Sequence, residues 1–265
     1  MSKNNVLSPL LIGTSGFSYD DWVGPFYPPG LPRSEWFEFY ASQFRCLEIN
    51  SSYYSFLSPK TVRSLVDRAP VGFRFAIKLH QSLTHERKDL AKAIQQTQQQ
   101  NQLFQESRML ATQLAQFPHS FSPSPQAWHY LHQLAENLSP LCIEFRNARW
   151  QNEETVQRLR EWGVSFCVVD QPELPGLMKF KPIVTHPPAY VRFHGRNAKM
   201  WYSHQEAWER YNYLYTEEEL RQRCDDIKTM ANQAGEVLIF FNNHYQAQAV
   251  VNARQLIGLL KHSTD

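Results

Sequence analysis

The chain has 265 residues, enough for two small domains or for one domain of barrel size. Hydrophobic residues make up 42% of it, and its formal net charge of +2 provides no overall field that would draw it to nucleic acid or to a membrane. No run approaches the ~18 apolar residues of a membrane-spanning helix, and residues 1–5 lack the apolar segment of a secretory signal. We therefore expect a soluble, cytoplasmic protein with no membrane partner.

The positions of the four cysteines are typical of a protein in a reducing compartment. Cys46, Cys142 and Cys167 lie in apolar runs that have the character of strands, and Cys224 stands apart from them. No two of the four have the close spacing of a metal-binding pair. Free cysteine is among the residue types most often buried in proteins. The sequence thus predicts buried thiols rather than disulfides or a metal site.

The N-terminal half of the chain alternates between runs with the two-residue period of a strand and runs with the spacing of an amphipathic helix. In chain order, the expected elements are a strand at 10–16, a helix at 34–44, a strand at 46–50, a helix at 58–68, a strand at 73–80, a helix at 89–107 and a strand at 109–117. Pro59 suits the first position of the second helix. The third helix is rich in glutamine but keeps an ordinary apolar pattern.

The C-terminal half continues the alternation. In chain order, the expected elements are a helix at 125–137, a strand at 141–146, a helix at 153–162, strands at 165–170 and 190–195, a helix at 216–234, a strand at 237–243 and a helix at 246–261. Segment 171–188 is rich in proline and shows no helical pattern. Thr216 and Glu219 have the spacing of a capping box at the start of the sixth helix.

Eight strands, seven of them followed by a helix, predict a parallel sheet with crossover connections. Eight such units in about 250 residues are typical of a (β/α)₈ TIM barrel. An open, doubly wound sheet is the competing architecture, but no glycine-rich phosphate turn follows the first strand. Since no repeat or linker divides the chain, we expect an α/β protein with one TIM-barrel domain over residues 1–265.

Four of the expected strands carry a polar face beside an apolar one. Because side chains of a strand alternate between its faces, one set should pack on the outer helices and the other should fill the barrel interior. The expected helix-facing residues are Leu47, Ile49, Phe75, Ile77, Ile143, Phe145, Val191 and Phe193. The expected inward residues are Glu48, Asn50, Lys78, His80, Glu144, Arg146, Arg192 and His194. Each inward pair lies at the C-terminal end of its strand, where barrel enzymes have their active sites.

Polar residues also end two further strands, and they are Asp170, Asn242 and Asn243. Buried charges cost free energy unless they are paired or in use. Glu144 with Arg146, or Glu48 with Lys78, are therefore candidates for structural ion pairs. The convergence of so many ionisable groups at one end of the barrel nevertheless favours a ligand site.

These residue types suit a hydrolase or lyase-like enzyme whose substrate carries a phosphate or a carboxylate. The candidate catalytic residues are Glu48 and Glu144 as general acid and base, with His194 or His85 as a second proton carrier near neutral pH. The expected anion-binding residues are Lys78, Arg146 and Arg192. Further expected substrate-binding residues are Asn50, Tyr54, His85, Asp170, Tyr202, Asn242 and Asn243. The rings of Tyr54, Tyr202 and Trp22 are suited either to stacking on a sugar or base or to packing within loops.

Two alternatives remain open. A divalent-metal variant would use Glu48, Glu144, Asp170 and His194 as ligands, although three cations in the same mouth would repel such an ion. The sequence itself requires no cofactor. A binding module would hold a metabolite without turnover, or single-stranded nucleic acid in a basic groove with stacking aromatics. No obligate protein partner is evident.

The chain also resembles a known family over nearly its whole length. The segments that carry the resemblance are Ile12-Gly13-Thr14-Ser15-Gly16-Phe17-Ser18-Tyr19 with Trp22, Phe26-Tyr27-Pro28, Leu47-Glu48-Ile49-Asn50 with Tyr53-Tyr54, Phe73-Arg74-Phe75 with Lys78, Thr84-His85, Gln116-Phe117-Pro118, Glu144-Phe145-Arg146 with Trp150, Arg192-Phe193-His194-Gly195 and Phe241-Asn242-Asn243 with Asn252-Ala253. In this order and spacing they resemble the YecE-like family, the domain of unknown function 72 (DUF72).

The resemblance implies a TIM barrel and little about activity. A likeness of such barrels to endonucleases of the endonuclease IV kind implies nucleic-acid processing as an alternative function, by analogy of fold. The chain departs from the family pattern at Gln246 and Ala247, where the last loop usually has a glycine. The glycines that usually precede the fourth strand are also absent at 109–112.

Overall fold

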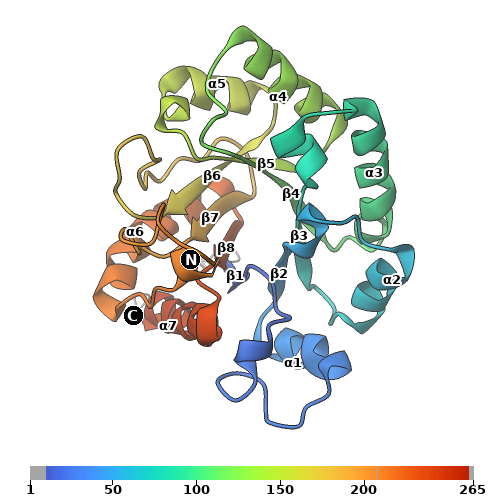
Figure 1. The fold of residues 1–265 in the computed structure, drawn as a ribbon, viewed down its shortest axis with the longest axis vertical. Coiled ribbons are helices and arrows are strands. Elements are labelled where there is room, and N and C mark those ends of the chain that lie inside the picture. Colours follow the sequence, from blue (N-terminus) through green and yellow to red (C-terminus); the bar gives the residue numbers. More distant parts are fainter. Residues whose placement is uncertain (1–9, 207, 263–265) are drawn as a thin grey trace, which may run out of the picture.

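In the computed structural model, which describes residues 10–206 and 208–262, eight parallel strands form a nearly closed barrel with helices around it (Figure 1). The strands are β1 Leu10–Thr14, β2 Cys46–Ile49, β3 Arg74–Lys78, β4 Leu110–Phe117, β5 Leu141–Phe145, β6 Ser165–Asp170, β7 Ala189–Phe193 and β8 Val237–Phe241. The helices are α1 Trp36–Gln43, α2 Pro59–Arg68, α3 Leu90–Glu106, α4 Pro125–Asn137, α5 Glu153–Glu161, α6 Glu217–Ala234 and α7 Gln248–His262. The predicted (β/α)₈ TIM barrel is confirmed.

The sheet order is β1-β8-β7-β6-β5-β4-β3-β2, so each strand lies beside its neighbours in sequence and β8 returns to β1. The two ends of the sheet meet at a bridge between Ser15 and Glu48. There the Gly16 N–H donates to the Glu48 carbonyl oxygen at 2.7 Å. Every predicted strand and helix is present with small shifts at its ends, and segment 171–188 joins β6 to β7 without a helix.

Side chains at the helix N-termini explain where several helices begin. The Ser58 hydroxyl accepts a hydrogen bond from the Thr61 N–H at the start of α2, ahead of Pro59. The predicted capping box of α6 is formed, because the Thr216 and Glu219 side chains each accept from the other's backbone N–H. Such contacts satisfy amide groups that have no partner within the first turn.

The predicted division between the two faces of each strand is also present. Phe75 of β3 packs against Phe37 of α1 and Phe104 of α3, with ring centroids 5.9 and 4.9 Å apart. These contacts place the apolar set between barrel and helices. Glu48 of β2 and Glu144 of β5, from strands that are not neighbours in the sheet, both contact Arg192 and therefore point into the interior.

Two further predictions concern burial and membranes. Cys46, Cys142, Cys167 and Cys224 are free and buried, as the sequence predicted. Across residues 10–206 and 208–262, none of the helices combines the length and the apolar character needed to cross a membrane.

The backbone keeps a left-handed conformation at the positions where the family usually has glycine. Gln246 has φ 48° and Ala247 has φ 60°. Outside the positions named from the family pattern, Arg108 precedes β4 with φ 57°. A side chain in this region is strained because its Cβ approaches the following carbonyl oxygen. The loop shape is retained at Gln246 by its N–H, which donates to Asp21 Oδ2 at 2.6 Å.

Gln246→Gly is expected to raise the free energy of unfolding by up to about 1 kcal/mol, because glycine adopts positive φ without strain. The Gln246 side chain is exposed, so little packing is lost. Urea denaturation measures the effect. The matched control is Gln99→Gly at an exposed position of α3, where the same change should lower stability by about 1 kcal/mol. A loss of stability in both variants would contradict the prediction.

Candidate functional site

The centre of the barrel interior is an ion-pair network around Arg192. This side chain of β7 is 1% exposed and lies between two carboxylates. Its Nη2 donates to Glu48 Oε1 at 2.7 Å, and its Nη1 donates to Glu144 Oε2 at 2.6 Å. The Tyr190 hydroxyl donates to Glu48 Oε2 at 2.6 Å. Although burial opposes the charge of Arg192, the two carboxylates hold its pKa well above the usual range.

Glu144 is bound by several donors at once. Besides the contact with Arg192, its Oε1 forms an ion pair with Arg146 Nε at 2.9 Å and accepts a hydrogen bond from His194 Nε2 at 3.2 Å. Burial raises the pKa of Glu144, but Arg192, Arg146 and His194 together hold it well below its usual range. Glu48 is likewise fully buried, with both carboxylate oxygens bonded. The geometry therefore does not favour the predicted acid–base role of either glutamate.

His194 is held as a neutral imidazole. A carboxylate can only accept and an amide nitrogen can only donate, so Nε2 carries the proton toward Glu144 and Nδ1 accepts from Asn242 Nδ2 at 3.2 Å. Burial, followed by the Arg146 guanidinium, lowers the pKa of His194 to about 3. It therefore titrates far below the neutral range predicted for a proton carrier. Asn242 is brought into the interior network as a positioning contact.

A second, outer layer of the site contains Lys78, at the C-terminal end of β3. Its ammonium lies over the Tyr53 ring, 4.5 Å from the centroid. Within the described part of the chain, no carboxylate lies within 4.0 Å of it, so the ion pair with Glu48 considered from the sequence does not form. Burial, and next the repulsion by Arg192, lower the pKa of Lys78 to about 8.

The segment between β7 and α6 completes this outer layer with residues that the sequence did not single out. The ring of Trp201, 2% exposed, has the Arg146 guanidinium 5.6 Å and the Arg210 guanidinium 5.3 Å from its centroid. Tyr211 lies close by, with ring centroids 6.5 Å from Trp201 and 6.1 Å from His194. Although burial raises the pKa of Tyr211, the cations Arg146, Lys78, Arg210 and Arg192 bring it below the usual value.

Two predicted residues of the β2–α2 and β3–α3 loops also lie near Lys78. His85 is partly buried, its Nδ1 is 2.9 Å from Thr84 Oγ1, and its ring meets the edge of Tyr53 at 5.1 Å. Burial, then Lys78, Arg87 and Arg146, lower the pKa of His85 to about 4. Asn50 places its Oδ1 in the interior without a hydrogen-bond partner among the described residues. That oxygen is free to accept from a ligand.

Asp170 is bound elsewhere. Arg196 contacts both of its oxygens at 2.7 Å, Arg223 Nε donates to Oδ2 at 2.9 Å, and the Tyr215 hydroxyl donates to Oδ1 at 2.9 Å. Arg223 belongs to α6, so these contacts fasten β6 to the outer helix layer. No oxygen of Asp170 is left for a substrate, and its predicted binding role is set aside.

The remaining predicted substrate-binding residues, Asn243, Tyr54 and Tyr202, lie outside the ion-pair network around Arg192. Asn243 Nδ2 donates to the Tyr213 carbonyl at 2.8 Å and to Asn252 Oδ1 at 2.9 Å, contacts that tie β8 to the loop before α6. Tyr54 and Tyr202 are 73% and 62% exposed. They are therefore accessible to a ligand at the rim but do not line the buried network.

The four proposed ligands of the metal variant do not come together. Arg192 separates Glu48 from Glu144, and Asp170 is bound to arginines at the α6 side. No group of three or more histidine, cysteine or acidic side chains in the described ranges has the arrangement of a metal site. The cationic character of the outer layer further disfavours a divalent ion there.

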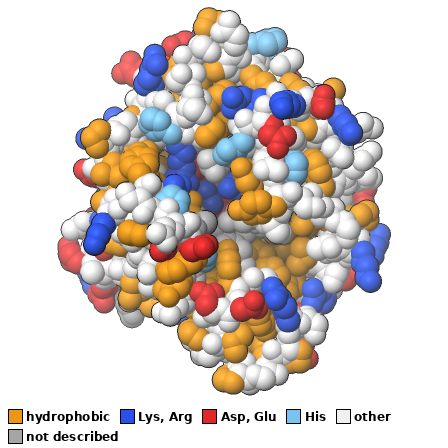
Figure 2. All heavy atoms as spheres, viewed as in Figure 1, with side chains coloured by type: hydrophobic (Ala, Val, Ile, Leu, Met, Phe, Trp, Pro, Cys, Tyr) orange, Lys and Arg blue, Asp and Glu red, His pale blue; other side chains and the backbone are white. Residues whose placement is uncertain are grey.

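The outer surface agrees with this arrangement. In Figure 2, lysine and arginine side chains gather in a hollow near the middle of the face, inside the ring of helices.

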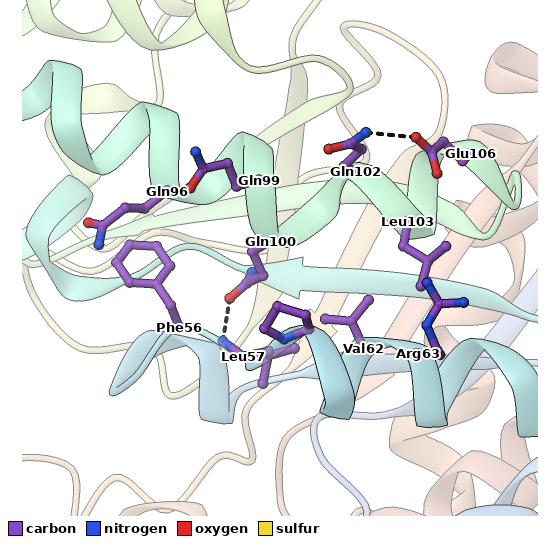
Figure 3. Close-up of a pocket in the computed structure, with 11 residues that line it drawn as sticks. Phe56, Leu57, Val62, Arg63, Gln96, Gln99, Gln100, Gln102, Leu103 and Glu106 are labelled. Carbon is purple, nitrogen blue, oxygen red and sulfur yellow. Dashed lines mark hydrogen bonds between the residues drawn. The ribbon is translucent and has the colours of Figure 1, made fainter.

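A separate groove of 410 Å³ lies between α2 and α3 (Figure 3). Four glutamines and five apolar residues make up most of its lining, and Gln100 Oε1 there accepts from the Leu57 N–H at 2.7 Å. Because it carries no cluster of ionisable groups and lies away from the strand ends, it is not the candidate active site.

Comparisons with known proteins give one consistent result. The family model described as "Protein of unknown function DUF72" matches residues 11–265. The UPF0759 protein YunF of Bacillus subtilis (strain 168) is 26% identical over 276 residues, which cover 95% of this chain and 94% of that protein.

Solved structures agree with the family match. A DUF72 family protein from Thermotoga maritima MSB8 is 38% identical, with a TM-score of 0.87 over 95% of this chain and 99% of that one. A DUF72 family protein from Enterococcus faecalis V583 is 26% identical, with a TM-score of 0.83 over 96% of each chain. The resemblance drawn from the sequence motifs is thereby confirmed.

Proposed function

Because the chain belongs to the DUF72 family, whose description assigns no activity, we propose a function from the chemistry of the site itself. The protein is an enzyme that acts on a small anionic substrate, with a phosphate or carboxylate group bound at the C-terminal mouth of the barrel. The binding groups are Lys78, Arg146 and Arg210, with Asn50 as a further acceptor. Arg192, which the sequence also predicted to bind the anion, serves instead as the charged centre of the floor, the buried network of Glu48, Arg192, Glu144 and His194 beneath them.

The observation that carries the proposal is an excess of positive charge. Four cations, Lys78, Arg146, Arg192 and Arg210, surround Tyr211, whereas the interior network supplies two carboxylates. Within residues 10–206 and 208–262, neither Lys78 nor Arg210 has a carboxylate within 4.0 Å. Burying uncompensated cations costs free energy. A bound dianion would neutralise the two positive charges that remain, and Arg146 and Arg210 can offer it planar donors.

A small ligand fits better than a nucleic-acid strand. Single-strand binding uses aromatic side chains exposed along a basic track, on which successive bases stack. Here Trp201 is 2% exposed and lies against two arginines, so its ring is not available for a base to stack on. The exposed rings of Tyr54 and Tyr202 remain at the rim and suit contact with one sugar or ring rather than with a strand.

We expect inorganic phosphate to raise the melting temperature, since a ligand at 100 times its Kd stabilises a protein by about 2.7 kcal/mol. Lys78→Met and Arg210→Met should each weaken phosphate binding about tenfold or more, as a charged hydrogen bond is lost. Thermal shift and calorimetry measure both effects. Arg158→Met, at a partly exposed position of α5, is the matched control and should leave binding unchanged.

Pyruvate and a short single-stranded oligonucleotide are the comparison ligands. A shift with phosphate or pyruvate that disappears in the two variants supports the proposal. A shift with the oligonucleotide alone, falling steeply with added salt, would replace it by nucleic-acid binding. Equal shifts in Lys78→Met, Arg210→Met and Arg158→Met would refute the assigned site.

A further inference from the structure

We propose that Lys78 is a nucleophile that forms an imine with an aldehyde or ketone carrying the anionic group, and that Tyr211 transfers the proton. The inference rests on the proposed anion site and adds the reaction class. Arg146 and Arg210 would then hold the anionic group of such a substrate, while Lys78, once deprotonated, reacts with its carbonyl carbon. An imine-forming lysine needs three things: a neutral amine at working pH, access for a carbonyl compound and a nearby acid–base group. The outer layer of the site provides each of them.

Lys78 has the surroundings of a reactive amine rather than of a structural cation. It keeps partial exposure at the end of β3, and its contact is the Tyr53 ring instead of a carboxylate. The charges of Arg192, Tyr211, Glu144 and Glu48 influence the pKa of Lys78. Lys78 in turn lowers the pKa of His85. Both glutamates are already paired with Arg192, and Glu144 also with Arg146, so they compensate the ammonium weakly. Burial and Arg192 favour the neutral amine, and they lower the pKa of Lys78 to about 8.

Tyr211 has the surroundings of a proton carrier. Its ring is fixed by Trp201, His194 and His244, at centroid distances of 6.5, 6.1 and 6.2 Å. The fully buried Tyr190 donates its hydroxyl proton to Glu48, whereas Tyr211 is only partly buried. The Tyr211 hydroxyl has no hydrogen-bond partner within the described residues and faces cations that favour the phenolate. It is therefore available to exchange a proton with a ligand.

The reaction balances with these groups alone. The lone pair of the neutral Lys78 amine forms the C–N bond, while the carbonyl π electrons move to oxygen. Tyr211 takes a proton from nitrogen and returns it to that oxygen, giving a carbinolamine. A second transfer of the same kind releases water as the C=N bond forms. The amine supplies two hydrogens and the carbonyl supplies the oxygen, so no oxidant, metal or further reagent is consumed. The imine can then accept electrons from an adjacent C–C or C–H bond, which is lyase chemistry.

Reductive trapping tests the inference directly. The full chain is incubated with dihydroxyacetone phosphate or pyruvate and sodium cyanoborohydride, and the product is mapped by peptide mass spectrometry. We expect an adduct on Lys78 with the mass of the ligand minus one oxygen, absent from Lys78→Arg. Its formation should rise with pH to half its maximum near pH 8, as the amine becomes neutral. Tyr211→Phe should slow trapping by about a hundredfold or more, the usual contribution of a positioned acid–base group.

Three results would overturn all or part of the inference, and each leaves a different part of the proposal intact. In the first, label is spread over surface lysines and Lys78 is unmodified, although the same compound raises the melting temperature. This result would refute imine formation but would leave the anion site supported. Failure of both compounds and of inorganic phosphate to bind removes the proposed function together with the imine. Unchanged trapping in Tyr211→Phe would overturn the role of the phenol.

Discussion

Arg192→Met is expected to lower the free energy of unfolding by about 3–5 kcal/mol, the range found when one partner of a buried ion pair is removed. The change leaves Glu48 and Glu144 without the guanidinium that contacts both, at 2.7 and 2.6 Å, and both carboxylates are fully buried. Glu144 keeps Arg146 and Glu48 keeps only the Tyr190 hydroxyl among the partners described. The uncompensated charge on Glu48 therefore dominates the cost.

Urea denaturation at neutral pH measures this effect, and Arg158→Met is again the control. Arg158 pairs with Glu154 one turn away on α5, where the two side chains are 41% and 59% exposed. Exposed pairs of this kind contribute about 0.3–0.5 kcal/mol. If Arg192→Met cost no more than Arg158→Met, the two glutamates would have to be protonated or hydrated inside the barrel, and the network would not be a charged one.

The predicted cost follows from a division of the site into a floor and a mouth. In the floor, Arg192 contacts Glu48 and Glu144, His194 contacts Glu144, and a pKa of about 3 keeps the His194 imidazole neutral. In the mouth, Lys78, Arg146 and Arg210 carry positive charge, and Arg210 Nε and the Tyr211 hydroxyl have no hydrogen-bond partner among the described residues. A rigid floor that fixes the position of reactive groups above it is the arrangement by which protein scaffolds support catalysis.

Strand periodicity was sufficient to predict the floor residues but not their contacts. Alternation along a strand determines that Glu48, Glu144 and Arg192 point inward, because parity depends only on sequence. Which of them meet depends on the tilt and stagger of strands that are not neighbours in the sheet. The ion pairs considered from the sequence were therefore Glu144 with Arg146, which forms, and Glu48 with Lys78, which does not. That Arg192 lies between both glutamates could be seen only in the structure of the closed barrel.

The mouth was harder to predict because its residues come from irregular loops. The segment between β7 and α6 was recognisable as aromatic, but it has no period that separates buried from exposed rings. Tyr202 was selected and is 62% exposed, whereas Trp201 and Tyr211 contact the site. For Asp170, the position at a strand end was correctly assigned, but Arg196 and Arg223, which bind it, lie 26 and 53 residues later in the chain. No local pattern links such residues.

Between pH 7.5 and pH 5, we expect His194 to remove about 2 kcal/mol from the free energy of unfolding. In the folded protein its pKa is about 3, whereas an unfolded histidine has a pKa of roughly 6.5. Below pH 6.5 the unfolded chain therefore binds a proton that the folded chain does not, and stability falls by about 1.4 kcal/mol per pH unit. The loss begins as the pH drops through the unfolded value and would be complete near the folded one.

The test compares the pH dependence of wild type with that of His194→Gln, whose amide can still donate to Glu144. The variant should lose about 2 kcal/mol less than wild type over this interval. His85 also has a lowered pKa, of about 4, but it is present in both proteins and its contribution cancels. Glu144 contributes little above pH 5, because its pKa is well below the usual range when folded and is roughly 4.3 when unfolded. Parallel stability curves would mean that folded His194 takes up a proton near neutral pH. It would then regain the role of proton carrier that the sequence assigned to it, and the acid–base chemistry of the site would have to be divided between His194 and Tyr211.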